Sequence, residues 1–223
     1  MQKYVVIVAG GSGTRMKREI PKQFIPVAGK PILMHTLEAF QKADESIQII
    51  LVLPESQVLG WKSLCAQYNF ELPHQITHGG DSRFQSVKNG LAQIKDFTGL
   101  VAIHDGVRPL ISTHIISESY RVAESKGNAI VAVPLKDSIR WAKGSENKVQ
   151  DRSEYQLVQT PQTFQVALIK TAFDTDYDTA FTDDATVLEA TGEKINLIEG
   201  DYRNIKITTP EDLIVAEAFL ANA

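Results

Sequence analysis

Residues 4–15 read YVVIVAGGSGTR, and this stretch decides the fold. Its first part, Tyr4 to Ala9, is a short β-branched run without a polar interruption, which is typical of a strand buried on both faces. The run stops at Gly10 and Gly11, where a loop begins. A buried strand that passes directly into a glycine loop predicts the first strand of an α/β domain. Ligands of such domains bind beyond the carboxyl ends of the strands, where this loop would lie.

Strand-like and helix-like segments alternate along the rest of the chain. Further apolar strands are expected at 47–53, 99–104 and 129–133, helices at 31–42, 82–94 and 113–125, and a last helix from Thr209 and Pro210. Because the strands are apolar throughout, the pattern predicts a Rossmann-like, mostly parallel sheet with helices on both faces. Residues 136–155 do not fit this alternation and read as two short arms around a polar tip. We therefore expect one domain over 1–223, with a protruding β-arm at 136–155 that packs on a second subunit.

The composition excludes several classes of protein. Apolar residues make up 43% of the 223 residues and charged residues 22%, which is ordinary for a globular protein. The net charge of −4 argues against broad nucleic-acid binding. Cys65 is the single cysteine, which excludes an intrachain disulfide and a multi-cysteine metal site. No secretory leader and no apolar run of about 18 residues is found, so a cytoplasmic location without a membrane partner is expected.

The glycine loop matches neither of two familiar phosphate-binding motifs. The dinucleotide fingerprint needs glycine at position 16, which is Met16, and the Gly-Lys-Ser/Thr of a P-loop does not occur. The loop still offers backbone N–H groups that can cradle a phosphate. Arg15 and Lys22 add two cations beside it, which suits a triphosphate. The glycines alone are equally compatible with a tight turn flanked by solvated cations.

A series of motifs extends over almost the whole chain. They are GGSGTRMKREIPKQF at 10–24, GGDSR at 79–83, HDGVRP at 104–109, QTPQ at 159–162, TDDA at 182–185 and NIKITTP at 204–210. In this order they resemble the nucleotidyltransferases that join a nucleoside triphosphate to a sugar or polyol phosphate. Among these enzymes, the motifs resemble those of the 2-C-methyl-D-erythritol 4-phosphate cytidylyltransferase family. The resemblance implies that CTP and this polyol phosphate give 4-diphosphocytidyl-2-C-methyl-D-erythritol and pyrophosphate, in non-mevalonate isoprenoid precursor biosynthesis.

The resemblance also implies a role for individual residues and for a metal ion. Catalytic roles fall on Arg15, Lys22 and Asp105, and Asp105 is also expected to bind Mg²⁺ or another divalent cation. The nucleotide is expected to contact Ala9, Gly10, Gly11, Gly13, Gly80, Asp81 and Ser86. The polyol phosphate is expected to contact Arg108, Ser138, Arg152, Thr182 and Lys206, with Ser138 standing where the family commonly has threonine. The family further implies a homodimer, in which Arg152 acts in its own site or in the partner's.

Two other functions stay open at the level of sequence. Ribitol-5-phosphate cytidylyltransferases share most of these motifs, although Asp151-Arg152 and the TDDA motif favour methylerythritol phosphate. A non-catalytic nucleotide-binding protein of the same fold would also keep the glycine loop, but it could lose Lys22 and Asp105, which are present. The absence of a credible nucleophilic triad fits a transferase of this kind, because a phosphate monoester, with a second pKa of about 6, is itself an anionic nucleophile at neutral pH.

Overall fold

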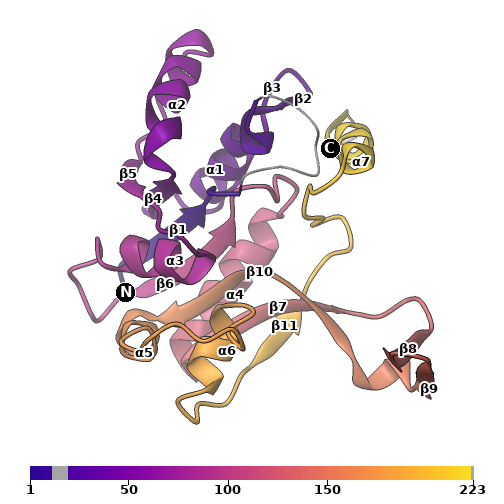
Figure 1. Ribbon diagram of the computed structural model, residues 1–223. Helices are drawn as coiled ribbons and strands as arrows, with labels where there is room; N and C mark the ends of the chain where they lie inside the picture. Colours follow the sequence, from indigo (N-terminus) through magenta and orange to yellow (C-terminus); the bar gives the residue numbers. More distant parts are fainter. Residues whose placement is uncertain (12–19, 222–223) are drawn as a thin grey trace.

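The structure, a computed structural model, describes residues 1–11 and 20–221 (Figure 1). Within these residues, seven strands form one sheet in the order β11-β7-β10-β6-β1-β4-β5. The strands are β1 (Lys3–Val8), β4 (Gln48–Leu53), β5 (Gln75–His78), β6 (Leu100–Asp105), β7 (Asn128–Pro134), β10 (Gln156–Gln165) and β11 (Leu197–Glu199). β1 pairs in parallel with β4 and β6, β4 with β5, and β7 with β11. The expected mostly parallel sheet is confirmed.

One strand of this sheet, β10, runs against its neighbours. It pairs in antiparallel fashion with both β6 and β7, and the sequence pattern did not predict it. Its register shifts between Val158 and Gln162, and proline lies at position 161 within this irregular stretch. The segment is rich in glutamine and threonine and contains a proline, and neither feature indicates a central strand. The irregularity brings Thr160 beside the end of β6, where the Thr160 hydroxyl accepts a hydrogen bond of 3.1 Å from the Asp105 N–H.

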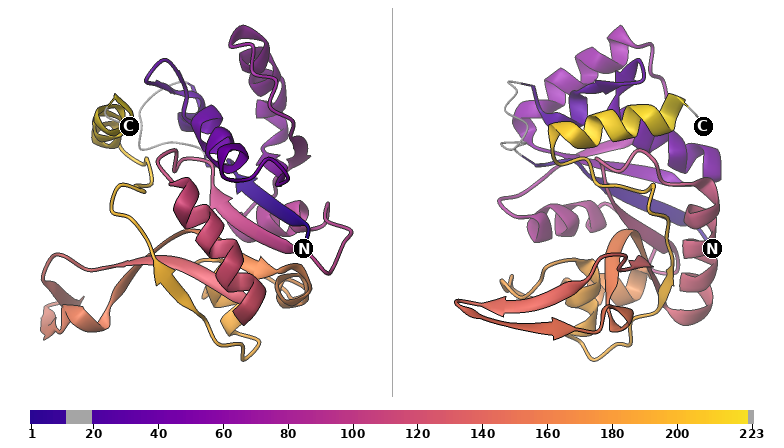
Figure 2. Two further views of the ribbon diagram at one scale, coloured as in Figure 1. Left: turned by 180° about the vertical axis from the view of Figure 1, so that it is seen from behind. Right: turned by 90° about the vertical axis from the view of Figure 1, so that its right-hand side faces the viewer.

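Helices cover both faces of the sheet (Figures 1 and 2). On one face lie α1 (Ile32–Ala43), α2 (Glu55–Gln67) and α4 (Thr113–Lys126); on the other lie α3 (Arg83–Leu91), α5 (Val166–Ala172) and α6 (Asp184–Glu189). Strand β1 shows why its sequence lacks alternation. Val5 and Ile7 belong to the core under the first set of helices, whereas Tyr4 and Val6 belong to the core under the second. A strand with both faces buried needs apolar side chains at every position.

A third apolar cluster joins two distant parts of the chain next to the glycine loop. It packs Ile25 and Val27, which follow the 3₁₀ turn η2 (Lys22–Phe24), against Ile207 and against Ala216 of α7 (Pro210–Ala221). Strands β2 (Pro26–Val27) and β3 (Lys30–Pro31) form the small hairpin between η2 and α1. The cluster fixes the segment that carries Lys22 against the segment that carries Lys206. No helix in the described part of the chain is long and apolar enough to cross a membrane.

A hairpin projects from the body at the position where the sequence predicts an arm (Figures 1 and 2). Strands β8 (Ile139–Lys143) and β9 (Glu146–Gln150) pair only with each other in this part of the structure, and Gly144 makes the turn with a positive φ of 59°. The chain then returns to β10 through the short turn η3 (Arg152–Glu154). Because the hairpin lies outside the main sheet, its side chains remain exposed, including Trp141 and Val149.

Candidate functional site

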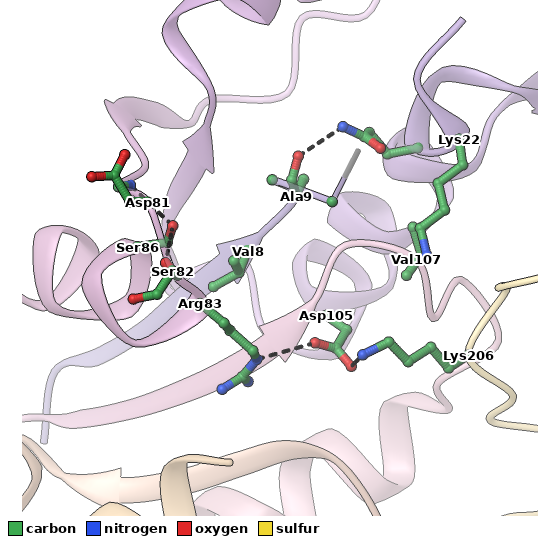
Figure 3. Close-up of a pocket in the computed structure, with 14 residues that line it drawn as sticks. Val8, Ala9, Lys22, Asp81, Ser82, Arg83, Ser86, Asp105, Val107 and Lys206 are labelled. Atoms are coloured by element: carbon green, nitrogen blue, oxygen red, sulfur yellow. Dashed lines mark hydrogen bonds and ion pairs between the residues drawn. The ribbon is translucent and has the colours of Figure 1, made fainter. Parts of the chain in front are cut away.

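A cavity of about 320 Å³ opens where β1 and β6 end, facing the loop after β5 (Figure 3). Its lining residues are Val8, Ala9, Gly10, Gly11, Lys22, Gln23, Gly80, Asp81, Ser82, Arg83, Ser86, Asp105, Val107 and Lys206. A second cavity of about 240 Å³ shares Arg83, Asp105 and Lys206 with it and adds Arg108, Val158, Gln159, Thr160, Gln162, Thr182 and Asp183. The carboxyl edge of a parallel sheet is where α/β proteins bind ligands. Because the two cavities share Arg83, Asp105 and Lys206, ligands bound in them would lie next to each other.

The loop after β5 forms one wall of the first cavity. Ser82 caps α3, because its hydroxyl accepts a hydrogen bond of 3.0 Å from the Gln85 N–H. Ser86 accepts from the Gly80 N–H at 3.1 Å and donates to the Ser82 carbonyl at 2.9 Å, which holds the loop closed against the helix. Gly80 is required here, since a Cβ at this position would lie 2.2 Å from Cγ of Gln85. Asp81, which was expected to contact the nucleotide, lines the cavity.

The opposite wall joins the end of β1 to η2. Gln23 is only 1% exposed, and its Nε2 donates to the Ala9 carbonyl at 2.8 Å and to Oε1 of Gln57 at 2.6 Å. The carbonyl oxygen of Ala9 has a second lone pair and can accept a further hydrogen bond from a ligand. Lys22 donates from Nζ to the Ile207 carbonyl at 3.2 Å, so its ammonium lies next to the segment that precedes α7. The predicted residues Gly13 and Arg15 lie outside the described residues.

The carboxylate of Asp105, at the end of β6, lies among three cationic side chains. Nζ of Lys206 is 3.0 Å and Nε of Arg108 is 3.4 Å from its Oδ2. Nε of Arg83 is 3.7 Å from its Oδ1. Burial by itself would raise the pKa of Asp105, but the charges of Arg83, Lys206 and Arg108 lower it well below the usual range. The carboxylate is therefore ionised, and the cations Arg108 and Lys206 beside it can also attract anionic ligands.

Backbone and amide contacts hold these charged groups in place. Nη1 of Arg108 donates to the Asn204 carbonyl at 2.7 Å, and Nδ2 of Asn204 donates to the Thr160 carbonyl at 2.8 Å. The chain that leads to Lys206 is thus tied to both β10 and the loop after β6. His104 is fully buried, and burial lowers its pKa to about 3. It is therefore a neutral core residue.

The structure brings most of the predicted site residues together and separates two of them. Ala9, Gly10, Gly11, Lys22, Gly80, Asp81, Ser86 and Asp105 line the first cavity, and Arg108, Thr182 and Lys206 line the second. Ser138 and Arg152 line neither cavity within this chain; both are exposed at the base of the arm, where Nη1 of Arg152 donates to the Lys136 carbonyl. Their separation follows from the outward course of the hairpin.

Sequence reasoning missed several residues that shape the site. Gln23, Gln159, Gln162 and Asp184 were not predicted as site residues, although all four fall inside the quoted motifs. Gln162 connects these two motifs, because it donates to Oδ2 of Asp183 at 2.9 Å and accepts from the Ala185 N–H at 2.8 Å. The motifs indicate that these segments belong to the site, but they do not predict which side chains contact each other.

Comparison with known proteins gives one consistent match. A family model described as 2-C-methyl-D-erythritol 4-phosphate cytidylyltransferase matches residues 3–222. A curated relative of that name from Phocaeicola vulgatus is 50% identical over 220 residues, which is 99% of this chain and 100% of the relative. The solved 4-diphosphocytidyl-2C-methyl-D-erythritol synthase from Anaerococcus prevotii superimposes with a TM-score of 0.83 at 29% identity, covering 98% of this chain and 95% of that one. The Thermus thermophilus cytidylyltransferase superimposes with a TM-score of 0.79 at 30% identity over 100% of both chains.

Proposed function

The chain belongs to the 2-C-methyl-D-erythritol 4-phosphate cytidylyltransferase family, and we propose that it condenses CTP with 2-C-methyl-D-erythritol 4-phosphate. An oxygen of the polyol phosphate attacks the α-phosphorus of CTP, the bond to the β-phosphate breaks, and pyrophosphate leaves. The products are pyrophosphate and 4-diphosphocytidyl-2-C-methyl-D-erythritol, an intermediate of isoprenoid precursor biosynthesis. The observation that carries this assignment is the pair of adjoining cavities that share Arg83, Asp105 and Lys206.

The first cavity is the proposed nucleotide site. Cytosine presents an amino donor and two acceptors. The free lone pair of the Ala9 carbonyl can accept from the amino group. Backbone N–H groups of the loop that carries Gly80 can donate to the acceptors, as can the Ser86 hydroxyl once its proton turns from the Ser82 carbonyl to the base. The Asp81 carboxylate is a further acceptor on this wall. The triphosphate would then extend toward Gly10, Gly11 and Lys22. Gly13 and Arg15 are proposed to take part in holding it, from the sequence alone.

The second cavity is the proposed site of the polyol phosphate. Arg108 and Lys206 supply positive charge for its phosphate group, and the Thr182 hydroxyl can bind a hydroxyl of the polyol. Such a site orients a nucleophile that is already anionic, so the chain needs no general base. Lys22, on the far side of the shared wall, is placed to stabilise the negative charge that develops around the α-phosphorus.

We also propose that the reaction uses Mg²⁺ or a similar divalent cation, bound partly by Asp105. The described residues hold no group of three or more His, Cys, Asp or Glu side chains that could bind a metal by themselves. A single carboxylate fits Mg²⁺, which takes one or two protein carboxylates and completes its shell with water and substrate phosphates. Oδ1 of Asp105 is the better placed oxygen, since among the described residues its ion pair is the long contact to Arg83. When bound, the ion would neutralise charge on the phosphates.

Activity with two polyols tests the proposed function. Purified protein with CTP and Mg²⁺ should release pyrophosphate when 2-C-methyl-D-erythritol 4-phosphate is added, and chelation of the metal by EDTA should stop the release. Ribitol 5-phosphate is the control, and we expect little or no product from it. Release with ribitol 5-phosphate alone would keep the mechanism but transfer the chain to the other substrate. Binding of CTP without turnover of either polyol would support a non-catalytic nucleotide-binding protein.

The protruding arm supports a homodimer. A two-stranded hairpin is marginally stable alone in water, and this one carries exposed apolar side chains: Trp141 is 43% and Val149 is 74% exposed. Leu157 and Val158 of β10, next to the arm, are 50% and 44% exposed. We infer that a second copy of the chain covers this surface. Arg152 and Ser138 would then reach the partner's polyol phosphate rather than the one bound by their own chain.

Light scattering measures this state directly. We expect the unmodified protein to have about twice the mass of one chain, and Trp141→Glu with Val149→Glu to dissociate it, because buried charges at a closed interface are costly. The exposed Glu45→Gln, on the loop before β4, is the matched control and should leave the mass unchanged. A monomeric mass for the unmodified protein at micromolar concentration would contradict the dimer. It would leave the assignment of the two cavities untouched.

A further inference from the structure

A carboxylate that the proposed reaction does not use lies behind the site. Asp184 is the first residue of α6, and its side chain is 1% exposed. Oδ1 and Oδ2 accept hydrogen bonds from Nη1 and Nη2 of Arg83 at 2.8 and 2.6 Å. Asp184 lines neither of the two substrate cavities, whereas Arg83 lines both. The ion pair with Arg83 is therefore a direct link between Asp184 and the two cavities.

Arg83 contacts two carboxylates, with a short ion pair to Asp184 and a longer one to Asp105. Both of its terminal nitrogens are engaged by Asp184, so that only Nε points toward Asp105, at 3.7 Å from Oδ1 (Figure 3). A guanidinium binds a carboxylate best through two parallel N–H groups, and its side edge offers such a pair from Nε and one Nη. Asp105 receives the weaker contact because Asp184 already binds both terminal nitrogens of Arg83.

The position of Asp184 is itself well determined. The N-terminus of α6 is tied to β10, because Gln162 accepts from the Ala185 N–H at 2.8 Å. The neighbouring Asp183 is held in place by two other contacts. Its Oδ1 caps the helix by accepting from the Thr186 N–H at 2.9 Å, and its Oδ2 accepts from Gln162. If Asp184 lost its charge, Asp105 would be the carboxylate left within reach of Arg83.

We propose that Asp184 is a positioning residue, which turns the fork of Arg83 away from Asp105 and so keeps Oδ1 of Asp105 open to the divalent cation and the nucleotide. This inference rests on the proposed function for the role of Asp105. Without Asp184, the side edge of Arg83 would close on Asp105 as a two-point ion pair. A cation would then have to displace a guanidinium before it could bind, and the enzyme would need more Mg²⁺.

The variant Asp184→Asn tests this, since it keeps the shape of the side chain and removes its charge. In a crystal structure of the ligand-free variant, we expect a terminal nitrogen of Arg83 within hydrogen-bond distance of Oδ1 of Asp105. In kinetics, we expect the Mg²⁺ concentration at half-maximal rate to rise about tenfold or more, while kcat at saturating Mg²⁺ changes much less. Glu189→Gln, an exposed change on the same helix, is the matched control and should keep the normal Mg²⁺ requirement.

A double variant separates positioning from a merely structural effect. If Asp184 acts through Arg83, adding Arg83→Gln to Asp184→Asn should bring the Mg²⁺ requirement back toward normal, even though KM for the substrates rises because Arg83 lines both cavities. Equal Mg²⁺ requirements in the single and double variants would overturn the proposal, as would a structure in which Arg83 stays away from Asp105. Asp184→Ser, which leaves room for water around the guanidinium, carries the same expectation should the asparagine variant fail to fold.

These outcomes are distinct from a failure of the proposed function. If the unmodified protein releases no pyrophosphate with either polyol, the proposed function is wrong, and the position of Arg83 in the variant structure still decides the inference about its fork. If the unmodified protein is active and Asp184→Asn shows the normal Mg²⁺ requirement, the function stands and the inference fails.

Discussion

Replacing Asp105 by asparagine is expected to lower kcat by about 10²–10³-fold, the magnitude typical of losing one electrostatic contact to a transition state. The physical reason is that this carboxylate balances Lys206, Arg108 and Arg83, which lie 3.0, 3.4 and 3.7 Å from it, and is also the proposed protein ligand of the divalent cation. An asparagine keeps the size of the side chain but provides no charge for the cation. Pyrophosphate release at saturating CTP and polyol phosphate measures the effect.

The control for this variant uses the other end of the same strand. Asp96 lies in the loop before β6 and accepts hydrogen bonds from the N–H and hydroxyl of Thr98. Because it lies at the edge of the sheet opposite the site, Asp96→Asn should keep a normal kcat. Circular dichroism and thermal unfolding establish that Asp105→Asn is folded. A folded Asp105→Asn enzyme with an unchanged rate would contradict the placing of the reaction at the end of β6.

The parts of the fold that the sequence predicts are those fixed by local physics. The apolar run that becomes β1 ends at the glycines, as expected, and the strand expected over 99–104 is β6, shifted by one residue to Leu100–Asp105. The helix expected over 82–94 ends earlier, at Leu91. The pattern did not predict β10, α5 or α6, because their formation depends on tertiary contacts that periodicity does not record. β10 is rich in glutamine and threonine and contains Pro161, and α5 and α6 are too short for a helical period to show.

The candidate site divides in the same way. Glycines beside a strand, and cations beside the glycines, are neighbours in sequence and could be recognised there. Asp184 was not, since its partner Arg83 is 101 residues away, and a lone aspartate in a sequence does not reveal which cation will face it. Ser138 and Arg152 show the converse. The family resemblance assigns both to the polyol phosphate, yet one chain does not bring them to either cavity, so their proposed roles depend on the proposed second subunit.

Replacing Lys22 by alanine is the second change with a large expected effect, again about 10²–10³-fold in kcat. The ammonium of Lys22 donates to the Ile207 carbonyl at 3.2 Å, which places it at the wall of the first cavity. Phosphate oxygens are stronger acceptors than a carbonyl and would draw the ammonium toward them when CTP binds. The charge on these oxygens grows during transfer, and an interaction that strengthens in the transition state raises kcat rather than lowering KM.

The division between kcat and KM therefore tests the role of Lys22 more sharply than activity alone. We expect Lys22→Ala to lower kcat and to change KM for CTP by much less, and Lys22→Arg to recover only part of the rate, because a planar fork does not replace a compact ammonium. Lys30→Ala is the matched control: this lysine pairs with Glu38 at 2.6 Å, away from both cavities, and its loss should leave kcat unchanged. If Lys22→Ala raised KM for CTP and kept kcat, Lys22 would bind the nucleotide equally well in the ground state and in the transition state. The transferred phosphoryl group would then have to be stabilised by residues of the glycine loop.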